Sequence, residues 1–194
     1  MPHSRFSCRR ARAASGILIP ALFLLAFAAP CEAFAQGQHN RPQFHLISSS
    51  FSAGGFIPSR YTCSGENISP MLRWTAALPG TVAFALIVTD PDAPGHTWVH
   101  WVAYNLPGGE RDLPAAIAKG NQIQTGGVQG MNDFHDVGYG GPCPPPGKPH
   151  RYFFTLYALN ARLPLRPGAT RSQVEQAMKG HILAQTTLMG LYGR

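Results

Sequence analysis

Two short segments that combine proline and glycine with charged side chains constrain this chain most. The first is Asp90-Pro91-Asp92-Ala93-Pro94, and the second spans residues 140–152. Proline fixes φ and glycine reaches backbone angles that other residues avoid, so both segments should form stiff, tightly shaped loops. Glycine and proline supply 21 and 18 of the 194 residues, which favours many turns and few long helices. Stiff polar loops beside apolar strands are a common way to build a small ligand pocket.

Short apolar runs separated by turn residues predict strands rather than helices. The runs cover residues 44–49, 82–88, 98–106, 152–159 and, at the end of the chain, 182–192. The run at 82–88 is apolar throughout, as expected for a strand that is buried on both faces. We therefore predict a mainly β protein, an antiparallel β-sandwich with one or two short helices near the C-terminus.

One helix is indicated between the last two strands. Thr170 stands three residues before Gln173, the spacing of a capping box. Val174 and Met178 then fall on one helical face together with Ala177, and Gly180 is a natural stop. A single helical turn is also expected at residues 115–118.

The first 35 residues read as a secretory signal peptide. Four arginines precede an apolar stretch at residues 17–29, and Ala33-Phe34-Ala35 offers a cleavage site before Gln36. The alternative is an uncleaved membrane anchor, although the apolar stretch is shorter than the roughly 20 residues of a membrane span. A lipid anchor on Cys31 fits poorly, because Pro30 occupies the place of the small residue. We predict a single domain over residues 36–194, located in the periplasm or outside the cell.

Charge after removal of residues 1–35 excludes one class of partner. That segment holds four of the 16 basic and one of the nine acidic residues, which leaves a net charge of +4. No cluster of Lys and Arg longer than two remains, so nucleic acid is not expected to bind. The modest positive balance favours anionic ligands only weakly.

Acidic and imidazole side chains follow the buried strand. Asp90 and Asp92 lie two residues apart and share a face if the chain is extended. For Asp90 we expect a pocket role, since it stands where a buried strand opens into a loop. Asp92 could equally serve a local turn. His100, inside the next apolar run, is either a core histidine or a pocket group.

A second set of polar groups begins the strand at 152–159. His150 and Tyr152 share a strand face, with Arg151 directed away from it. Imidazole, phenol and carboxylate groups together can donate to and accept from a phosphate or carboxylate ligand. The turn at Gly140-Gly141 could add free backbone N–H groups for an anion.

Two cysteines remain once the first 35 residues are removed. Cys63 and Cys143 form an even pair, which in an oxidising compartment suggests one disulfide. Two free, partly buried thiols are the alternative. A metal role is disfavoured because the chain has neither a CxxC pair nor helical HxxxH spacing.

These motifs, taken in order, resemble those of the phosphatidylethanolamine-binding protein family and its bacterial Raf kinase inhibitor-like branch. The family carries a DPDxP run, a histidine on the next strand and a Gly/Pro-rich stretch ending in HRY. The bacterial branch adds four further segments, here residues 61–63, 67–70, 126–134 and 179–184. The resemblance covers about residues 44–194 and implies a β-sandwich with an anion-accepting pocket. The implied pocket residues are Asp90, Asp92, His100, Gly141, Pro142, His150 and Tyr152.

One position departs from the animal members of that family. They often have two adjacent histidines on the second strand, and here the first of the two positions is Val99. Animal-type phospholipid or kinase specificity is therefore not implied.

The sequence favours a binding protein over an enzyme. The leading hypothesis is a secreted or periplasmic protein that binds a small anionic ligand, a phosphate or a phospholipid head group, without a cofactor or metal. The resemblance also implies a role as an inhibitor-like modulator of a kinase or protease. The alternatives are a hydrolase or a metalloprotein using Asp90, His100 and His150, and a structural interaction module. Against a hydrolase, there is no GxSxG motif and no evident nucleophile beside a base.

Overall fold

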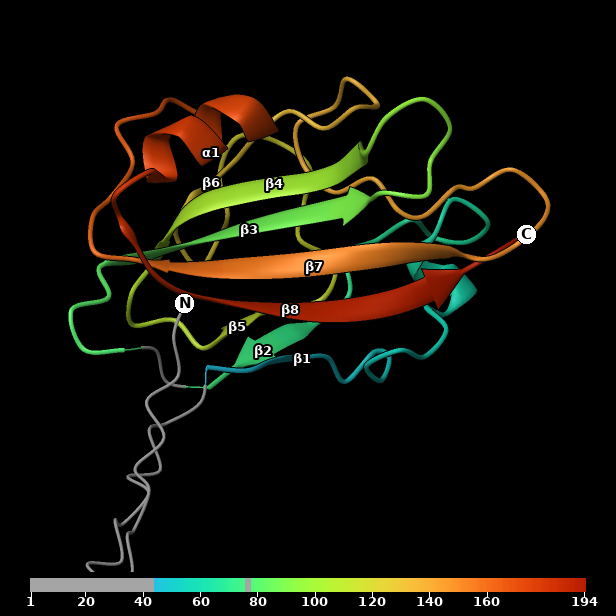
Figure 1. The fold of residues 1–194 in the computed structure, drawn as a ribbon, viewed down its shortest axis with the longest axis horizontal. Coiled ribbons are helices and arrows are strands. Elements are labelled where there is room, and N and C mark those ends of the chain that lie inside the picture. The colour runs from blue at the N-terminus through green and yellow to red at the C-terminus, as the bar shows by residue number, and fades with distance from the viewer. Residues whose placement is uncertain (1–43, 76–77) are drawn as a thin grey trace, which may run out of the picture. The chain divides into compact units, whose positions relative to one another are not determined.

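Two antiparallel sheets face each other in the computed structural model, which describes residues 44–75 and 78–194 (Figure 1). The smaller sheet has the order β1-β2-β5, formed by Leu46–Ile47, Leu72–Trp74 and Asp112–Leu113. The larger sheet has the order β6-β4-β3-β7-β8, formed by Val128–Gln129, Trp98–Pro107, Ala83–Asp90, His150–Leu159 and Ile182–Tyr192. The predicted antiparallel β-sandwich is confirmed. The expected signal peptide, residues 1–35, lies outside the described residues.

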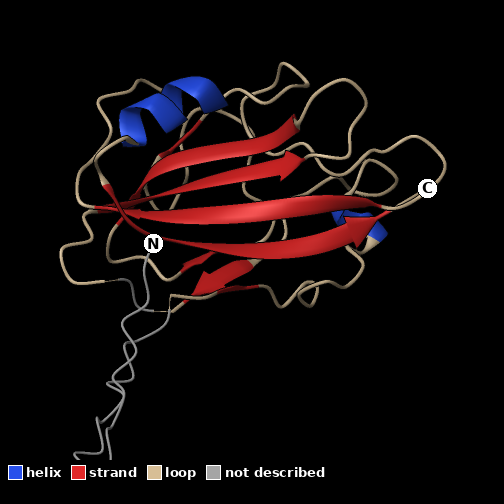
Figure 2. Cartoon of the chain, viewed as in Figure 1, coloured by secondary structure: helices blue, strands red, loops and turns tan. Residues whose placement is uncertain are grey.

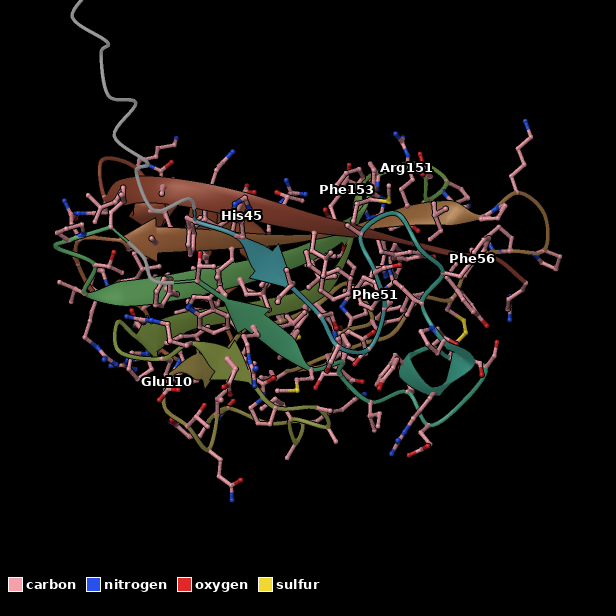
Figure 3. All side chains as sticks on the ribbon, turned by 90° about the horizontal axis from the view of Figure 1, so that it is seen from below. His45, Phe51, Phe56, Glu110, Arg151 and Phe153 are labelled. Atoms are coloured by element: carbon pink, nitrogen blue, oxygen red, sulfur yellow. A yellow bond between two sulfur atoms is a disulfide. The ribbon has the colours of Figure 1, made fainter. Side chains whose placement is uncertain are left out.

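The central strand β3 explains how the layers hold together. Its side chains alternate, so Phe84, Leu86 and Val88 enter the core between the sheets. Ala85 and Ile87 point the other way, into a second apolar cluster beneath the helix. This double burial is what the uniformly apolar run predicts. The loop after β1 carries Phe51, which Figure 3 labels. This loop closes the main core by packing the Phe51 ring against that of Phe154, with ring centroids 5.4 Å apart.

The helix α1, Arg171–Met178, covers the outer face of β3 and β4 (Figure 2). Its N-terminus carries the predicted capping box: Thr170 accepts from the Gln173 backbone N–H, and the Gln173 side chain accepts from that of Thr170. Val174 and Met178 are its buried residues. A 3-10 turn at Ser59–Tyr61, not foreseen from sequence, follows Pro58. Among the described residues, no helix is long and apolar enough to cross a membrane.

Two local expectations were wrong. Residues 115–118 form a bend instead of a helical turn, because buried Ser69 binds the segment from outside. The Ser69 carbonyl accepts from the Ala116 N–H and its hydroxyl accepts from the Ile117 N–H, which draws both donors away from helical partners. The first strand pairs over Leu46–Ile47 only. Its expected continuation stops where the Ser48 hydroxyl bonds the Met71 carbonyl.

Candidate functional site

A cavity of about 200 Å³ lies where three strand ends of the large sheet meet. Asp90 ends β3, Trp98 begins β4 directly opposite it, and His150 begins β7. These ends lie toward the chain's C-terminus in Figure 1, and the two Pro-containing loops enclose them. The cavity is lined by Asp90, Ala93, Pro94, Trp98, His100, Phe134, Cys143, Pro144, Pro145 and His150. Its floor is polar and its walls are mostly apolar.

Asp90 and His150 form a buried pair in the floor. The His150 Nδ1 lies 2.8 Å from Asp90 Oδ2, and the two side chains are only 12% and 4% exposed. The other carboxylate oxygen, Oδ1, accepts from the Asp92 backbone N–H. A carboxylate can only accept here, so Nδ1 of His150 carries the hydrogen. Asp90 therefore fixes the imidazole and leaves its Nε2 as the group that can meet a ligand.

The backbone fixes which ring nitrogen of His100 carries the hydrogen. Its Nδ1 lies 2.7 Å from the Gly140 carbonyl oxygen, which can only accept, so Nδ1 carries the hydrogen. Burial lowers the pKa of His100, and the carbonyl only partly opposes this effect. The ring is therefore neutral near pH 7 and its Nε2 bears a lone pair. In residues 44–75 and 78–194, no group hydrogen-bonds this Nε2, and it is not among the sealed polar atoms.

Tyr152 packs against His100 in the protein interior. It is fully buried and its ring meets that of His100 edge-to-face, with centroids 5.2 Å apart. Its hydroxyl is sealed and has no hydrogen-bond partner in the described residues. Burial and the nearby Asp90 carboxylate raise the pKa of the phenol. The structure thus places Tyr152 next to His100 but not on the cavity surface.

Asp92 fastens a loop instead of lining this cavity. Both of its carboxylate oxygens bind the Arg151 guanidinium, at 2.7 and 2.9 Å, and Oδ2 also accepts from the Arg151 N–H. The hydrogen bonds from Arg151 lower the pKa of Asp92 to about 2. Arg151 lies over the Phe153 ring, and Figure 3 shows the two side chains together. Asp92 lines a neighbouring cavity formed with residues 145–150.

Gly141 and Pro142 contribute structure rather than free donors. The Gly141 N–H donates to Asn67 Oδ1 at 2.7 Å, and the Gly140 N–H donates to the His100 carbonyl. The backbone N–H groups expected to receive an anion are therefore already occupied. A Cβ at Gly141 would come within 2.5 Å of the Tyr61 carbonyl, so glycine permits close packing of two chain segments. Pro142 is buried, and neither residue lines the cavity.

A disulfide joins Cys63 to Cys143, whose Cα atoms are 5.3 Å apart. Both residues are exposed, and Cys143 forms part of the cavity wall. The bridge runs beside a hydrogen bond from the Cys63 N–H to the Pro142 carbonyl. Together they fix the Pro-rich segment to the segment that contains the 3-10 turn. Among the described residues, no three His, Cys, Asp or Glu side chains are grouped so that they could hold a metal ion.

The sequence interpretation missed the aromatic walls. Phe134 meets both Trp98 and His100 edge-to-face, with centroids 5.4 Å apart in each case. Trp98 stands at the first position of β4 and Phe134 in an irregular loop, so neither belongs to a periodic pattern. The one available signal was an aromatic residue inside the glycine-rich segment 126–134.

The family model for phosphatidylethanolamine-binding proteins matches residues 47–193. The chain belongs to the phosphatidylethanolamine-binding protein family. A protein of Methanothermobacter thermautotrophicus named UPF0098 is 48% identical over 150 residues, covering 77% of this chain and 99% of the relative. A UPF0098 protein of Aquifex aeolicus is 49% identical over 151 residues, covering 77% and 88%. The family predicted from the motifs is confirmed.

Solved structures of phosphatidylethanolamine-binding protein homologues have the same fold. The homologue from Chlamydia trachomatis superposes with a TM-score of 0.72 at 38% identity, covering 79% of this chain and 99% of that one. YbcL of Escherichia coli, described as a new member of the mammalian family, gives a TM-score of 0.73 at 34% identity, covering 78% and 98%. Fold and family therefore agree.

Proposed function

We propose that this protein binds a small phosphate-type oxyanion in the cavity between Asp90, His100 and His150, and that it acts as a binding protein without catalysing a reaction. The Asp90–His150 pair carries the proposal. The buried Asp90 carboxylate accepts from Nδ1 of His150 and so orients the imidazole in the cavity floor. In its protonated form, an imidazole held in this way donates Nε2–H to an anionic oxygen, which is a strong type of hydrogen bond.

The cavity's size supports a small ligand or a head group. Its volume of about 200 Å³ is below the roughly 300–1,000 Å³ of pockets that enclose drug-sized molecules. Among the described residues that line it, there is no serine, threonine or lysine, and Cys143 is in the disulfide. These are the side chains most often used as nucleophiles, so the lining favours binding over covalent catalysis.

We also propose that the protein is exported and acts in the periplasm or outside the cell. The signal-like residues 1–35 motivate this location, and the disulfide is of a kind that persists in oxidising compartments. The oxyanion would then be met outside the cytoplasm.

Calorimetric titration with inorganic phosphate tests the binding function. We expect His150→Ala to weaken phosphate binding about tenfold or more, the effect of losing one charge-assisted hydrogen bond. His181→Ala is the matched control, because His181 is an exposed histidine that contacts Asn160 and does not line the cavity. Equal phosphate affinity of the wild type and a folded His150→Ala protein would contradict the proposed site.

A further inference from the structure

The two histidines of the cavity present different faces to a ligand. His150 offers Nε2 from a ring whose Nδ1 is bound to a carboxylate. His100 offers Nε2 from a neutral ring whose Nδ1 is bound to the Gly140 carbonyl. A charged imidazole donates at its second nitrogen, whereas a neutral imidazole with its hydrogen on Nδ1 accepts there. With His150 in its protonated form, the cavity floor combines a donor at His150 with an acceptor at His100.

In the part of the chain that the structure describes, no group donates a hydrogen bond to Nε2 of His100. Within the described residues, the nearby backbone N–H groups of Gly140, Gly141 and Asp92 donate to the His100 carbonyl, Asn67 and Asp90 in turn. The indole N–H of Trp98 is sealed from the cavity. The hydrogen for His100 Nε2 must come from water or from the ligand. An anionic oxygen placed against it would face a lone pair, and a buried polar group left unpaired weakens binding.

We propose that this cavity selects phosphate monoesters, or free phosphate, over phosphate diesters, because the ligand must donate an O–H to His100 Nε2 while accepting from His150 Nε2. This inference rests on the proposed phosphate site and specifies its ligand class. A monoester in its monoanionic form carries both a P–O–H group and charged oxygens. A diester, the form of phosphate in an intact phospholipid, carries no P–O–H group and leaves the His100 acceptor unpaired.

Methyl phosphate and dimethyl phosphate test the proposal with matched charge. At about pH 5 both are monoanions, since the second pKa of a phosphate monoester is about 6. The two probes therefore carry the same charge. Dimethyl phosphate differs from methyl phosphate only in that a second methyl group replaces the acidic hydrogen. We expect calorimetry to show methyl phosphate binding at least about tenfold more tightly. Equal affinities would overturn the selection.

The pH dependence gives a second readout in the wild-type protein. Raising the pH from about 5 to about 8 removes the last hydrogen from methyl phosphate, whereas inorganic phosphate retains one. The affinity of methyl phosphate relative to inorganic phosphate should therefore fall about tenfold across this range. The charged or titratable groups around His100 are Asp90 on β3, Asp133 on the loop after β6, and Tyr152 and His150 on β7. These groups face both probes alike, so the ratio of the two affinities isolates the effect of the ligand's own hydrogen. A constant ratio would overturn the proposal.

The variant His100→Asn tests whether His100 causes the preference for monoesters. In His100→Asn, the side-chain amide can still donate to the Gly140 carbonyl, but nothing replaces Nε2. We expect the preference for methyl over dimethyl phosphate to fall to within about twofold, whereas His181→Asn should keep it. Should His100→Asn fail to fold, the two wild-type measurements still decide.

Two further results separate the hypotheses. If neither inorganic phosphate nor methyl phosphate binds, the proposed phosphate site is wrong and the selection falls with it. If inorganic phosphate binds but glycerophosphoethanolamine, a diester with an amine donor, binds as tightly as methyl phosphate, only the monoester assignment is overturned.

Discussion

His150 on β7 and Asp90 on β3 are joined across 2.8 Å at the point where both strands reach the cavity. The pair links neighbouring strands and also orients the nitrogen that meets a ligand. Removing one partner of a buried ion pair is costly, because the other charge stays buried without compensation. We expect His150→Ala to lower the free energy of unfolding by about 3 kcal/mol, measured by chemical denaturation.

Asp90→Asn should destabilise less than His150→Ala, because it removes the buried charge itself and leaves a neutral acceptor for the imidazole. It should still weaken phosphate binding about tenfold, since the imidazole loses its ionic partner. The double variant decides whether the residues act as a unit: its destabilisation should be smaller than the sum of the single effects. Additive effects would show that the two side chains are energetically independent.

The Asp92–Arg151 pair predicts a specific acid sensitivity. Arg151 depresses the pKa of folded Asp92 to about 2, below an unfolded value of about 3.9. The pair's stabilisation is therefore full above about pH 4 and is lost as the pH falls through about 2. Since both side chains are partly exposed, solvent screening keeps the effect on the free energy of unfolding small. Thermal unfolding of the wild type and Asp92→Asn should converge over this range. Glu110→Gln, a control at a partly exposed carboxylate outside the pair, should keep the wild-type dependence of Tm on pH.

Reduction of the disulfide should destabilise the protein strongly. The bridge closes a loop of 80 residues, and the chain-entropy model assigns such a closure roughly 4 kcal/mol. We expect Cys63→Ser with Cys143→Ser to lower the denaturation midpoint and to make it insensitive to reductant. Alkylation of two free thiols in freshly exported protein would contradict the pairing in the native state.

Phe134 should control which ligands fit. Its side chain lines both the cavity of about 200 Å³ and a neighbouring one of about 270 Å³ that includes Gly141 and Lys119. Phe134→Ala should join the two spaces and admit a bulkier ester. We expect the affinity of phenyl phosphate relative to methyl phosphate to rise at least about fourfold, the effect of burying one methylene group. No change in this ratio, with the fold intact, would show that Phe134 does not separate the cavities.

Export predicts a defined N-terminus. If cleavage follows Ala35, N-terminal sequencing of the exported protein should begin at Gln36. Recovery of an exported form that retains residues 1–35 would contradict cleavage at this site.

The fold was predictable because its main signals are local. The apolar run of β3, the capping box at Thr170 and the alternation of His150, Arg151 and Tyr152 each act over a few residues. The alternation along β7 correctly predicted that His150 and Arg151 point to opposite faces of the strand: His150 contacts Asp90 and Arg151 contacts Asp92. Family resemblance then placed these elements in one architecture.

The chemistry of the site was harder to predict because its partners are distant in sequence. The Gly140 carbonyl that sets the hydrogen of His100 lies 40 residues away, and the Asn67 oxygen that occupies the Gly141 N–H lies 74 residues away. Such contacts have no periodic signature. The two glycines were expected to donate to a ligand, whereas the fold uses their N–H groups to hold its own chain.

The double burial of β3 has a consequence for exchange with solvent. Its backbone N–H groups lie in the middle of the large sheet with apolar clusters on both sides. The amides of such strands exchange only when the whole molecule unfolds. The amides of exposed loops exchange through local unfolding, which costs little free energy. In deuterium exchange, the amides of β3 up to the Asp90 end of the cavity should label last, and those around Gly95 and Gly147 first. A ligand would therefore meet a floor as persistent as the native state itself, whereas the loops around Gly95 and Gly147 exchange long before the floor does.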